Sequence, residues 1–204
     1  MSMKRLLLMG MKGGTGKSTV AIHLAVAAAQ AGRSVTLMDT DPQATVMTWG
    51  KSRTAIEPQI IAGRAHDGAK RTNGANGRDL LVIDTPPRTE TSITNLAREA
   101  DLIVIPLHCT MPDLAASQVT FRMAQAAARP FVIVFNSVNP RALEVNEVRQ
   151  ELKAKGYTIA PMVLAVRTSF SRALSSGMAV TEFERQGKAA GEINELWNWI
   201  AKQI

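Results

Sequence analysis

Cysteine is almost absent from this chain, because Cys109 is the only one among 204 residues. A single cysteine excludes a disulfide within the chain and a metal cluster held only by cysteines of one chain. A free cysteine most often fills space in a core, so we expect Cys109 to be buried rather than reactive. This sparing use of cysteine fits a protein of the cytoplasm.

Long apolar runs are also missing, since charged residues or glycine interrupt each stretch before it could span a bilayer. The first residues, MSMKRLLLMG, combine a basic start with a short apolar run. No small-residue cleavage site follows, so we expect a strand there rather than a signal peptide. Internal repeats and linkers are not evident, and the length suits one domain, which we expect to cover residues 1–204.

Positive charge, by contrast, is plentiful. Lysine and arginine number 24 against 17 acidic residues, which gives a formal net charge of +7 and a pI near 10.0. A domain this basic favours polyanionic partners such as nucleic acid. Because the positive residues are spread along the chain, a merely solvated basic surface is the alternative.

Short apolar segments alternate with longer segments that have helical character. Nearly continuous apolar character predicts strands covered on both faces, and strand–helix alternation predicts a mostly parallel twisted sheet with helices on both faces, an α/β fold. The predicted strands are 5–11, 34–39, 79–84, 101–107, 131–136 and 158–164, and the predicted helices are 16–32, 42–53, 90–100, 111–128 and 141–156. In such sheets ligands bind at the carboxyl ends of the strands.

The segment KGGTGKS, residues 12–18, lies between the first predicted strand and the first predicted helix. Its glycines allow a tight turn that points successive N–H groups at phosphate oxygens, and the helix adds the positive end of its dipole. Lys17 is placed to neutralise the β- and γ-phosphates, and the Ser18 hydroxyl to ligate Mg²⁺. The usual first glycine of this motif is replaced by Met11, and Lys12 follows directly. The sequence therefore predicts a variant phosphate-binding loop (P-loop).

This variant resembles the deviant Walker A loop of the ParA/MinD family of ATPases, whose added lysine corresponds to Lys12. LMDTDPQATVMTW resembles the ParA form of the second motif, and LLVIDTPP resembles the Walker B and switch region. The likeness continues through IVIPLHCTMPDLAASQ, FNSVNPR and GMAVTEFERQGKAAGEINEL. It is greatest to the short ParF-type ParA partition proteins, which lack an N-terminal helix-turn-helix domain; we expect no such domain before residue 5.

The resemblance implies a Mg²⁺-dependent ATP hydrolase with the P-loop NTPase fold. ATP would lie against the P-loop, and Lys12 would reach across an ATP-dependent homodimer to the phosphates of the other subunit. Lys17 would serve the nucleotide of its own chain. The residues implied to contact nucleotide are Lys12, Gly13, Gly14, Thr15, Gly16, Lys17, Ser18, Thr19 and Asn136. If the resemblance fails at this position, Lys12 is a solvent-exposed loop lysine.

Acidic residues end the predicted strands at the same edge of the sheet. Asp84 is suited to hold Mg²⁺ through a bound water opposite Ser18. By resemblance, Asp39 supports Mg²⁺ from farther away, and Asp41 orients or activates the attacking water. Asp41 could instead be the N-cap of a helix that starts at Pro42, or could do both.

Two further predictions concern the nucleotide. Asn136 ends the fifth predicted strand, where the family uses an asparagine to read the adenine edge, although asparagine is also a common turn residue. The segment 84–95 resembles a switch that orders with ATP, and Thr85 would lie near the γ-phosphate. The glycine-rich and basic segment 63–79 is expected to be a surface excursion.

The function implied is an ATPase switch for plasmid partition, DNA segregation or another positioning task. The ATP dimer would bind DNA non-specifically on the nucleoid, and a ParB-like or cargo adaptor protein would stimulate hydrolysis. Candidate DNA contacts are Arg141, Arg149, Lys153, Lys155, Arg167 and Arg172. A solvated helix face is the alternative for each of them.

Two other functions were weighed. A MinD-like membrane switch would need an amphipathic anchor, and residues 192–204 do carry apolar residues at helical spacing. Their polar face is acidic rather than basic, so we expect docking onto the core and no stable membrane anchor. A metabolic relative of the nitrogenase-reductase type would need cluster-ligating cysteines, which this sequence lacks. The cargo is not evident from the sequence.

Overall fold

The computed structural model describes residues 2–63, 77–87, 91–139 and 141–204. Within these residues the chain forms a seven-stranded sheet with the order β3-β2-β4-β1-β5-β6-β7. Each neighbouring pair of strands is parallel, which confirms the predicted parallel sheet. The strands are β1 (Lys4–Leu8), β2 (Val35–Asp39), β3 (Gln59–Ala62), β4 (Leu80–Asp84), β5 (Leu102–Leu107), β6 (Phe131–Val138) and β7 (Ile159–Ala165).

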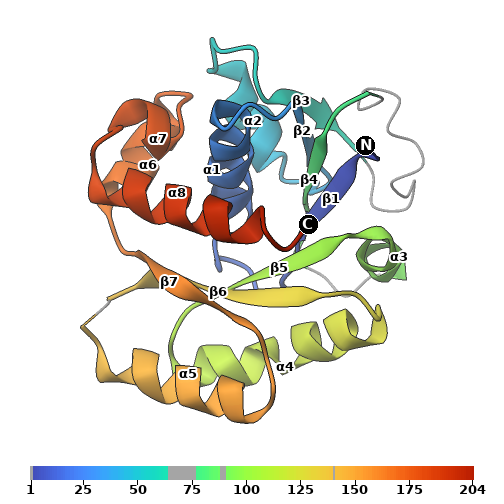
Figure 1. Ribbon diagram of the computed structural model, residues 1–204, viewed down its shortest axis with the longest axis vertical. Helices are drawn as coiled ribbons and strands as arrows, with labels where there is room; N and C mark the ends of the chain where they lie inside the picture. Colours follow the sequence, from blue (N-terminus) through green and yellow to red (C-terminus); the bar gives the residue numbers. More distant parts are fainter. Residues whose placement is uncertain (1, 64–76, 88–90, 140) are drawn as a thin grey trace.

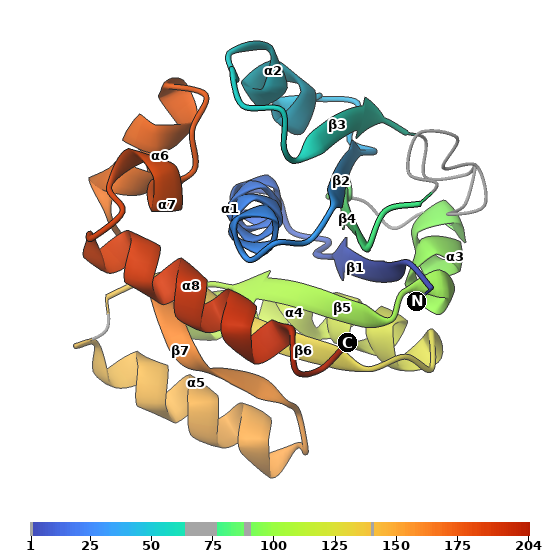
Figure 2. The same cartoon turned by 45° about the horizontal axis from the view of Figure 1, so that its top comes forward.

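Helices cover both faces of this sheet (Figures 1 and 2). One face carries α1 (Lys17–Gln30), α2 (Thr45–Lys51), α6 (Thr168–Ser175), α7 (Val180–Phe183) and α8 (Lys188–Ile200). The other face carries α3 (Thr91–Glu99), α4 (Met111–Ala126) and α5 (Leu143–Ala154). The sheet therefore separates two apolar layers, as an α/β fold requires.

The nearly continuous apolar character of the strands follows from this arrangement. Successive side chains of a strand point to opposite faces. Leu6 and Leu8 accordingly pack in the layer of α1 and α8, whereas Leu7 packs in the layer of α3, α4 and α5. With helices on both faces, neither set of positions can be polar without burying an unsatisfied group.

Three local predictions were wrong or incomplete. The strand β3 was not predicted, because it has four residues and lies at the edge of the sheet with most of its side chains only partly buried. The helices α6 and α7 were not predicted either. The helix predicted from Pro42 begins instead at Thr45, because a turn occupies the residues before it.

The last helix docks onto the core. Along α8, the apolar side chains of Ile193, Leu196, Trp197 and Ile200 are buried in the layer that also contains α1. These are the residues that could have formed a membrane anchor, so the expected docking onto the core is confirmed for them. Among the described residues, we find no helix with both the length and the apolar character needed to cross a bilayer.

The edge strand β7 is irregular. Its register with β6 shifts twice, and it contains Pro161, which has no N–H to donate. The carbonyl of Ala160 accepts a 3.0 Å hydrogen bond from Nη1 of Arg149 on α5. The opposite situation holds at the centre of the sheet, where β1 pairs regularly with both β4 and β5. The loop that follows β1 thus starts from a strand that is paired on both sides.

Candidate active site

The P-loop joins the end of β1 to the start of α1. Gly14 and Gly16 have φ angles of 79° and 88°, a left-handed conformation that is open to glycine and strained for other residues. Gly16 is further constrained, since a Cβ atom there would lie 2.2 Å from Nδ2 of Asn136. Fourteen residues of helix follow directly, so the unpaired N–H groups and the dipole of α1 both favour an anion at the loop.

Lys17 lies in the first turn of α1 and is only 6 % exposed. Burial lowers the pKa of Lys17, and the charges of Asp84 and Asp41 act in the opposite direction with smaller effect. A buried ammonium group of this kind gains free energy from a ligand that brings negative charge. Phosphate groups at the N-terminus of α1 would supply that charge.

Asp84 is fully buried where β4 ends. Its Cα is in register with Leu8 of β1 and with Asp39 of β2, so three strands deliver their last residues to one place. Within the described part of the chain, neither oxygen of Asp84 has a well-aligned hydrogen-bond partner. Burial raises the pKa of Asp84 to about 7, although the nearby Ser18 hydroxyl and Lys17 lower it in part. The charge of Lys17 thus offsets the burial of this carboxylate only in part, and a further cation would be favourable there.

This arrangement fits Mg²⁺. The ion commonly binds one or two protein oxygens together with phosphate oxygens and waters, and Asp84 and Ser18 offer a carboxylate and a hydroxyl beside the phosphate-binding loop. In the described residues, no group of three or more histidine, cysteine, aspartate or glutamate side chains could hold a metal by itself. A cation here would therefore depend on the nucleotide for part of its coordination.

Asp39 organises the segment that follows β2. Its Oδ1 accepts a 3.0 Å hydrogen bond from the Asp41 N–H, and its Oδ2 accepts a 2.9 Å bond from the Met47 N–H. Burial raises the pKa of Asp39, and these amide donors oppose that effect. The carboxylate thus ties the end of a central strand to both the Asp41 turn and α2.

Asp41 is half-buried in a turn of residues 41–44. Its Oδ1 accepts a 2.9 Å hydrogen bond from the Gln43 N–H, and its carbonyl accepts a 2.8 Å bond from the Ala44 N–H. Ala44, with φ of 54°, is the N-cap of α2. The alternative that Asp41 is the N-cap of a helix starting at Pro42 is therefore wrong, because Asp41 caps the preceding turn instead. Its role toward water stays a prediction.

Asn136 lies beneath the P-loop. It is 6 % exposed, and its Nδ2 donates a 2.8 Å hydrogen bond to the Thr15 carbonyl. Ser137 after it has a φ of 52°, an uncommon value for a residue other than glycine. The side chain therefore braces the loop, a contact that its sequence position did not reveal. The amide oxygen and second N–H keep the capacity that adenine recognition would use.

Lys12 reaches the start of α4. It is exposed, and its Nζ forms an ion pair with Oδ1 of Asp113 in the first turn of α4. Oδ2 of Asp113 accepts a 2.6 Å hydrogen bond from Thr110 Oγ1. Burial alone would raise the pKa of Asp113, but the bonds from Lys12 and Thr110 outweigh it and lower this pKa.

Sequence reasoning missed Asp113. The partner lies 101 positions after Lys12, and nothing in the sequence tells which strand neighbours β1. The signal that could have drawn attention to it is the spacing of Thr110 and Asp113, which is typical of a helix N-terminus. That terminus lies at the carboxyl edge of β5, beside the P-loop strand.

The structure describes only some of the residues named in the remaining nucleotide predictions. Gly13 and Gly14 are exposed and Thr19 is half-buried in the first turn of α1. The Thr85 hydroxyl is buried and donates a 2.7 Å hydrogen bond to the Leu8 carbonyl. Residues 88–90 of the predicted switch and residues 64–76 of the predicted surface excursion lie outside the described residues.

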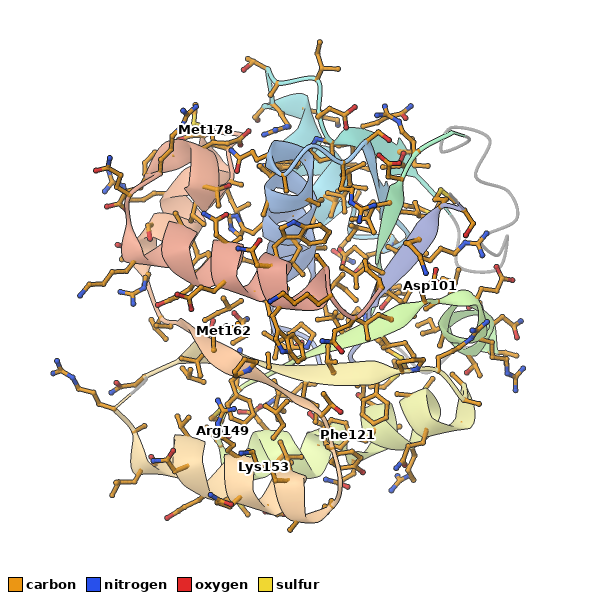
Figure 3. The ribbon with its side chains drawn as sticks, viewed as in Figure 1. Asp101, Phe121, Arg149, Lys153, Met162 and Met178 are labelled. Atoms are coloured by element: carbon orange, nitrogen blue, oxygen red, sulfur yellow. The ribbon has the colours of Figure 1, made fainter. Side chains whose placement is uncertain are left out.

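The six predicted DNA contacts differ in their availability. Arg141 and Lys153 are exposed, and Lys153 and Arg149 both extend from α5 (Figure 3). The other four side chains have partners within the chain: Arg149 with the Ala160 carbonyl and the Phe135 ring, Lys155 with Glu151, Arg167 with Glu192, and Arg172 with the Phe183 ring. Because these four side chains already have partners, their contribution to DNA binding stays a prediction.

Comparison with known proteins places the site in context. A family model described as the CobQ/CobB/MinD/ParA nucleotide binding domain matches residues 6–180. Maintenance of carboxysome distribution protein A of Halothiobacillus neapolitanus is 28 % identical over 206 residues, covering 96 % of this chain and 95 % of that protein. Protein ParA of Rhizobium radiobacter is 24 % identical, covering 89 % and 87 %. A plasmid partition protein of Borrelia burgdorferi, solved with AMPPNP, superposes with a TM-score of 0.78 at 15 % identity over the whole of both chains.

Proposed function

Because this chain belongs to the CobQ/CobB/MinD/ParA nucleotide-binding family, with relatives among ParA- and MinD-type positioning ATPases, we propose that it is an ATP-operated DNA-associated switch. It hydrolyses ATP with Mg²⁺, dimerises in the ATP state, binds DNA without sequence preference and positions a cargo. The single observation that carries this proposal is the contrast between its two P-loop lysines. Lys17 is buried in the phosphate cradle, whereas Lys12 is exposed and paired with Asp113.

Each site residue receives a role in this proposal. The backbone of residues 12–19 and Lys17 bind the phosphates of ATP, and Asn136 holds both the loop and the adenine edge. Ser18 and Asp84 hold Mg²⁺, with Asp39 supporting the site from farther away. When bound, Mg²⁺ neutralises charge on the β- and γ-phosphates. Asp41 orients the attacking water.

The proposed role of Lys12 follows from charge balance. Two ammonium groups on one short loop repel each other unless negative charge lies between them. In the single chain, Asp113 neutralises Lys12. In a face-to-face dimer, the γ-phosphate bound by the partner offers Lys12 a second anion, so ATP favours the dimer and hydrolysis weakens it. A cationic group supplied in trans also stabilises the transition state of phosphoryl transfer.

DNA is the proposed surface on which the dimer acts. The net charge of +7 favours a polyanion, and dimerisation doubles the number of exposed basic side chains such as Arg141 and Lys153. The apolar side chains that a MinD-like anchor would need are buried in α8. We therefore favour a cytoplasmic protein that joins the nucleoid in the ATP state, rather than a membrane-bound protein.

An adaptor protein on the cargo is the proposed stimulator of hydrolysis. One solved structural neighbour is a complex of MinC with MinD from Aquifex aeolicus, which is an example of partner binding by this fold. The relatives named for carboxysome distribution, plasmid partition and chromosome partitioning differ in cargo. The present chain is proposed to act as one unit over residues 1–204, with its cargo set by the adaptor.

The test compares the wild type with Lys12→Ala and with Lys202→Ala, an exposed lysine at the far end of the chain. Mass by light scattering is measured with ADP and with a non-hydrolysable ATP analogue. We expect wild type and Lys202→Ala to dimerise only with the analogue. Lys12→Ala should bind nucleotide within about twofold of wild type, remain a monomer and lose about 100-fold or more of its stimulated hydrolysis.

The DNA part of the proposal has its own measurement. Affinity for two unrelated duplexes should be equal and should fall about tenfold or more between roughly 50 and 200 mM salt. A wild type that stays monomeric with the analogue, or a Lys12→Ala variant that dimerises and hydrolyses normally, would contradict the switch. Salt-independent or sequence-selective binding would contradict the DNA role.

A further inference from the structure

The short helix α2 needs support from the rest of the fold. It has seven residues, and among the residues that the structure describes no side chain caps its N-terminus at Ala44. Helices of this length are not stable alone in water. Its near end is held by Asp39, which accepts the Met47 N–H. Its far end, after Lys51, is held by a set of contacts that none of the roles above explains.

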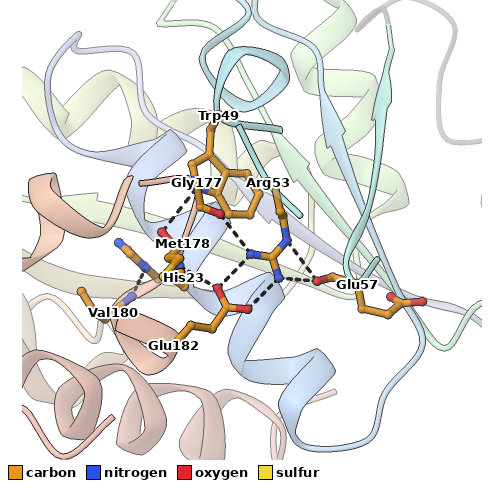
Figure 4. Close-up of polar contacts among 9 residues, drawn as sticks. His23, Trp49, Arg53, Glu57, Gly177, Met178, Val180 and Glu182 are labelled. Atoms are coloured by element: carbon orange, nitrogen blue, oxygen red, sulfur yellow. Dashed lines mark hydrogen bonds and ion pairs between the residues drawn. The ribbon is translucent and has the colours of Figure 1, made fainter. Parts of the chain in front are cut away.

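Arg53 is the centre of these contacts (Figure 4). Its side chain is 4 % exposed, and all five of its N–H donors have an acceptor. Nη1 and Nη2 each donate a 2.8 Å bond to one carboxylate oxygen of Glu182 on α7. The remaining donors bond the carbonyls of Glu57 and Gly177. A bidentate pair of this kind, in which the arginine is fully satisfied and the glutamate side chain is 19 % exposed, fixes geometry closely.

Backbone and aromatic contacts surround this pair. Gly177, in the turn between α6 and α7, has a φ of 67°, and a Cβ there would lie 2.2 Å from the Ser52 carbonyl oxygen. The guanidinium group of Arg53 lies 4.9 Å from the centre of the Trp49 ring. The Trp49 indole N–H in turn donates a 3.4 Å bond to the Met178 carbonyl. The far end of α2 therefore packs directly on the α6–α7 turn.

The α7 side of this junction is itself anchored. Glu182 also accepts a 2.8 Å hydrogen bond from the Ala179 N–H at the start of α7. The Val180 N–H donates a 3.2 Å bond to Nδ1 of His23, which lies on α1 two turns beyond Lys17. The junction thus connects α2 with the helix that carries the P-loop residues Lys17 and Ser18.

The geometry points to Arg53 and Glu182 as positioning residues for ATP hydrolysis. By fixing α2 against α7, they hold the Asp41 turn at a constant place relative to the phosphates bound at α1. Asp39 fixes the turn from the strand side, and the Arg53–Glu182 pair fixes the helix from the other end. The claim that this affects hydrolysis rests on the proposed function, whereas the mechanical link from Arg53 to the Asp41 turn does not.

The experiment uses Arg53→Lys, which keeps the charge but cannot make the forked contact, and Glu182→Gln, which keeps the shape but removes the charge. The matched control is Arg185→Lys, an exposed arginine in the segment after α7. Folding is checked by circular dichroism. Amide hydrogen exchange is then measured on peptides covering residues 39–51, followed by hydrolysis rate and KM for ATP.

We expect exchange at residues 41–47 to accelerate about tenfold or more in both junction variants and to stay unchanged in the control. The hydrolysis rate at saturating ATP should fall about tenfold, while KM changes by less than about twofold, because misplacing one group slows reaction without loosening the phosphates. If the pair had a structural role alone, the variants would be less stable, but kcat would not fall selectively while KM stayed constant.

The results that would contradict this proposal can be told apart. If exchange accelerates only at residues 52–57 and 177–182, with the Asp41 turn unaffected, the positioning claim is wrong whether or not the protein is an ATPase. If the turn is loosened and the rate is unchanged, Asp41 placement does not limit hydrolysis and the claim also fails. If the wild type does not hydrolyse ATP, the proposed function is wrong, and the exchange data alone judge the mechanical link.

Discussion

The two halves of the P-loop differ in how their lysines are neutralised. In the carboxyl-terminal half, residues 14–18, Lys17 is buried and burial lowers its pKa. In the amino-terminal half, residues 10–13, Lys12 is exposed and is already paired with Asp113. One ammonium group therefore has much to gain from a phosphate, and the other must exchange one anion for another. The two lysines of this loop thus differ: Lys17 can bind a phosphate directly, whereas Lys12 must first leave Asp113.

The supports of the two halves differ as well. The carboxyl-terminal half continues into α1 and is braced by Asn136 through the Thr15 carbonyl. The amino-terminal half is attached to α4, both through Asp113 and through Thr120 Oγ1, which accepts a 3.1 Å bond from the Met11 N–H. Movement of α4 relative to the sheet would consequently affect Lys12 before it affected Lys17.

The largest expected effect comes from Lys17→Ala. Removal of the ammonium group from the phosphate cradle should weaken ATP binding by about 100-fold or more and abolish measurable hydrolysis. The nucleotide-free variant should be at least as stable as wild type, because a buried cation is lost. Calorimetric titration with ATP and chemical denaturation check both statements. Unchanged ATP affinity would remove the contrast between Lys17 and Lys12.

Asp113→Asn should give a smaller effect, confined to the amino-terminal half. Loss of the partly exposed ion pair with Lys12 should lower the free energy of unfolding by about 1 kcal/mol. ATP affinity of the single chain should stay within about twofold of wild type, since the cradle around Lys17 is untouched. Denaturation and titration are again the measurements, with Glu144→Gln, a change of an exposed residue on α5, as the control. A large loss of ATP affinity would show that the halves are not independent.

The effect that is smallest at neutral pH, and that grows only as the pH falls, is a difference in acid sensitivity. Burial lowers the pKa of His23 on α1 to about 3, although the charge of Glu182 opposes this. The unfolded chain thus binds more protons between pH 6.5 and about 3, so His23 should cost stability as the pH falls through that range, by at most about 1.4 kcal/mol per pH unit. Asp113 has a lowered pKa, so its contribution is lost only below about pH 4.

Denaturation at several pH values separates the two ranges. In His23→Leu, the loss of stability between pH 6.5 and 4 should be reduced, whereas the loss below pH 4 should remain. In Asp113→Asn, the opposite is expected. Identical pH profiles for wild type and His23→Leu would mean that the imidazole is not held neutral in the folded chain.

Much of the fold was predictable because helix-covered parallel strands leave a strong pattern. Six of the seven strands were found from apolar runs, since alternate residues such as Leu7 and Leu8 are buried on opposite faces. The short edge strand β3 has no such requirement, because within the part of the chain that the structure describes no strand lies on one of its sides. The helices α6 and α7 are brief, and their position depends on contacts with Ser52, Arg53 and His23 that lie far away in the sequence.

The candidate site was predictable where chemistry is local. The P-loop motif and the aspartates that end β2 and β4 could be identified because strand ends and phosphate loops have short signatures. The register then showed that Asp39 and Asp84 are neighbours. The partners Asp113, for Lys12, and Arg53, for α2, could not be inferred, because such pairs depend on strand order and on the packing of loops. Asn136 was identified for adenine recognition, which stays a prediction, whereas its bond to the Thr15 carbonyl was not foreseen.

The irregular edge at β7 has a consequence for self-association. Filaments that grow by adding strand to strand need a row of free N–H and C=O groups along an exposed edge. Pro161 interrupts the donors, Arg149 occupies the carbonyl of Ala160, and the two register shifts bend the strand. Continuous polymers built through this end of the sheet are therefore disfavoured, and any higher-order array of the proposed dimer that uses this end would have to form through side-chain surfaces instead.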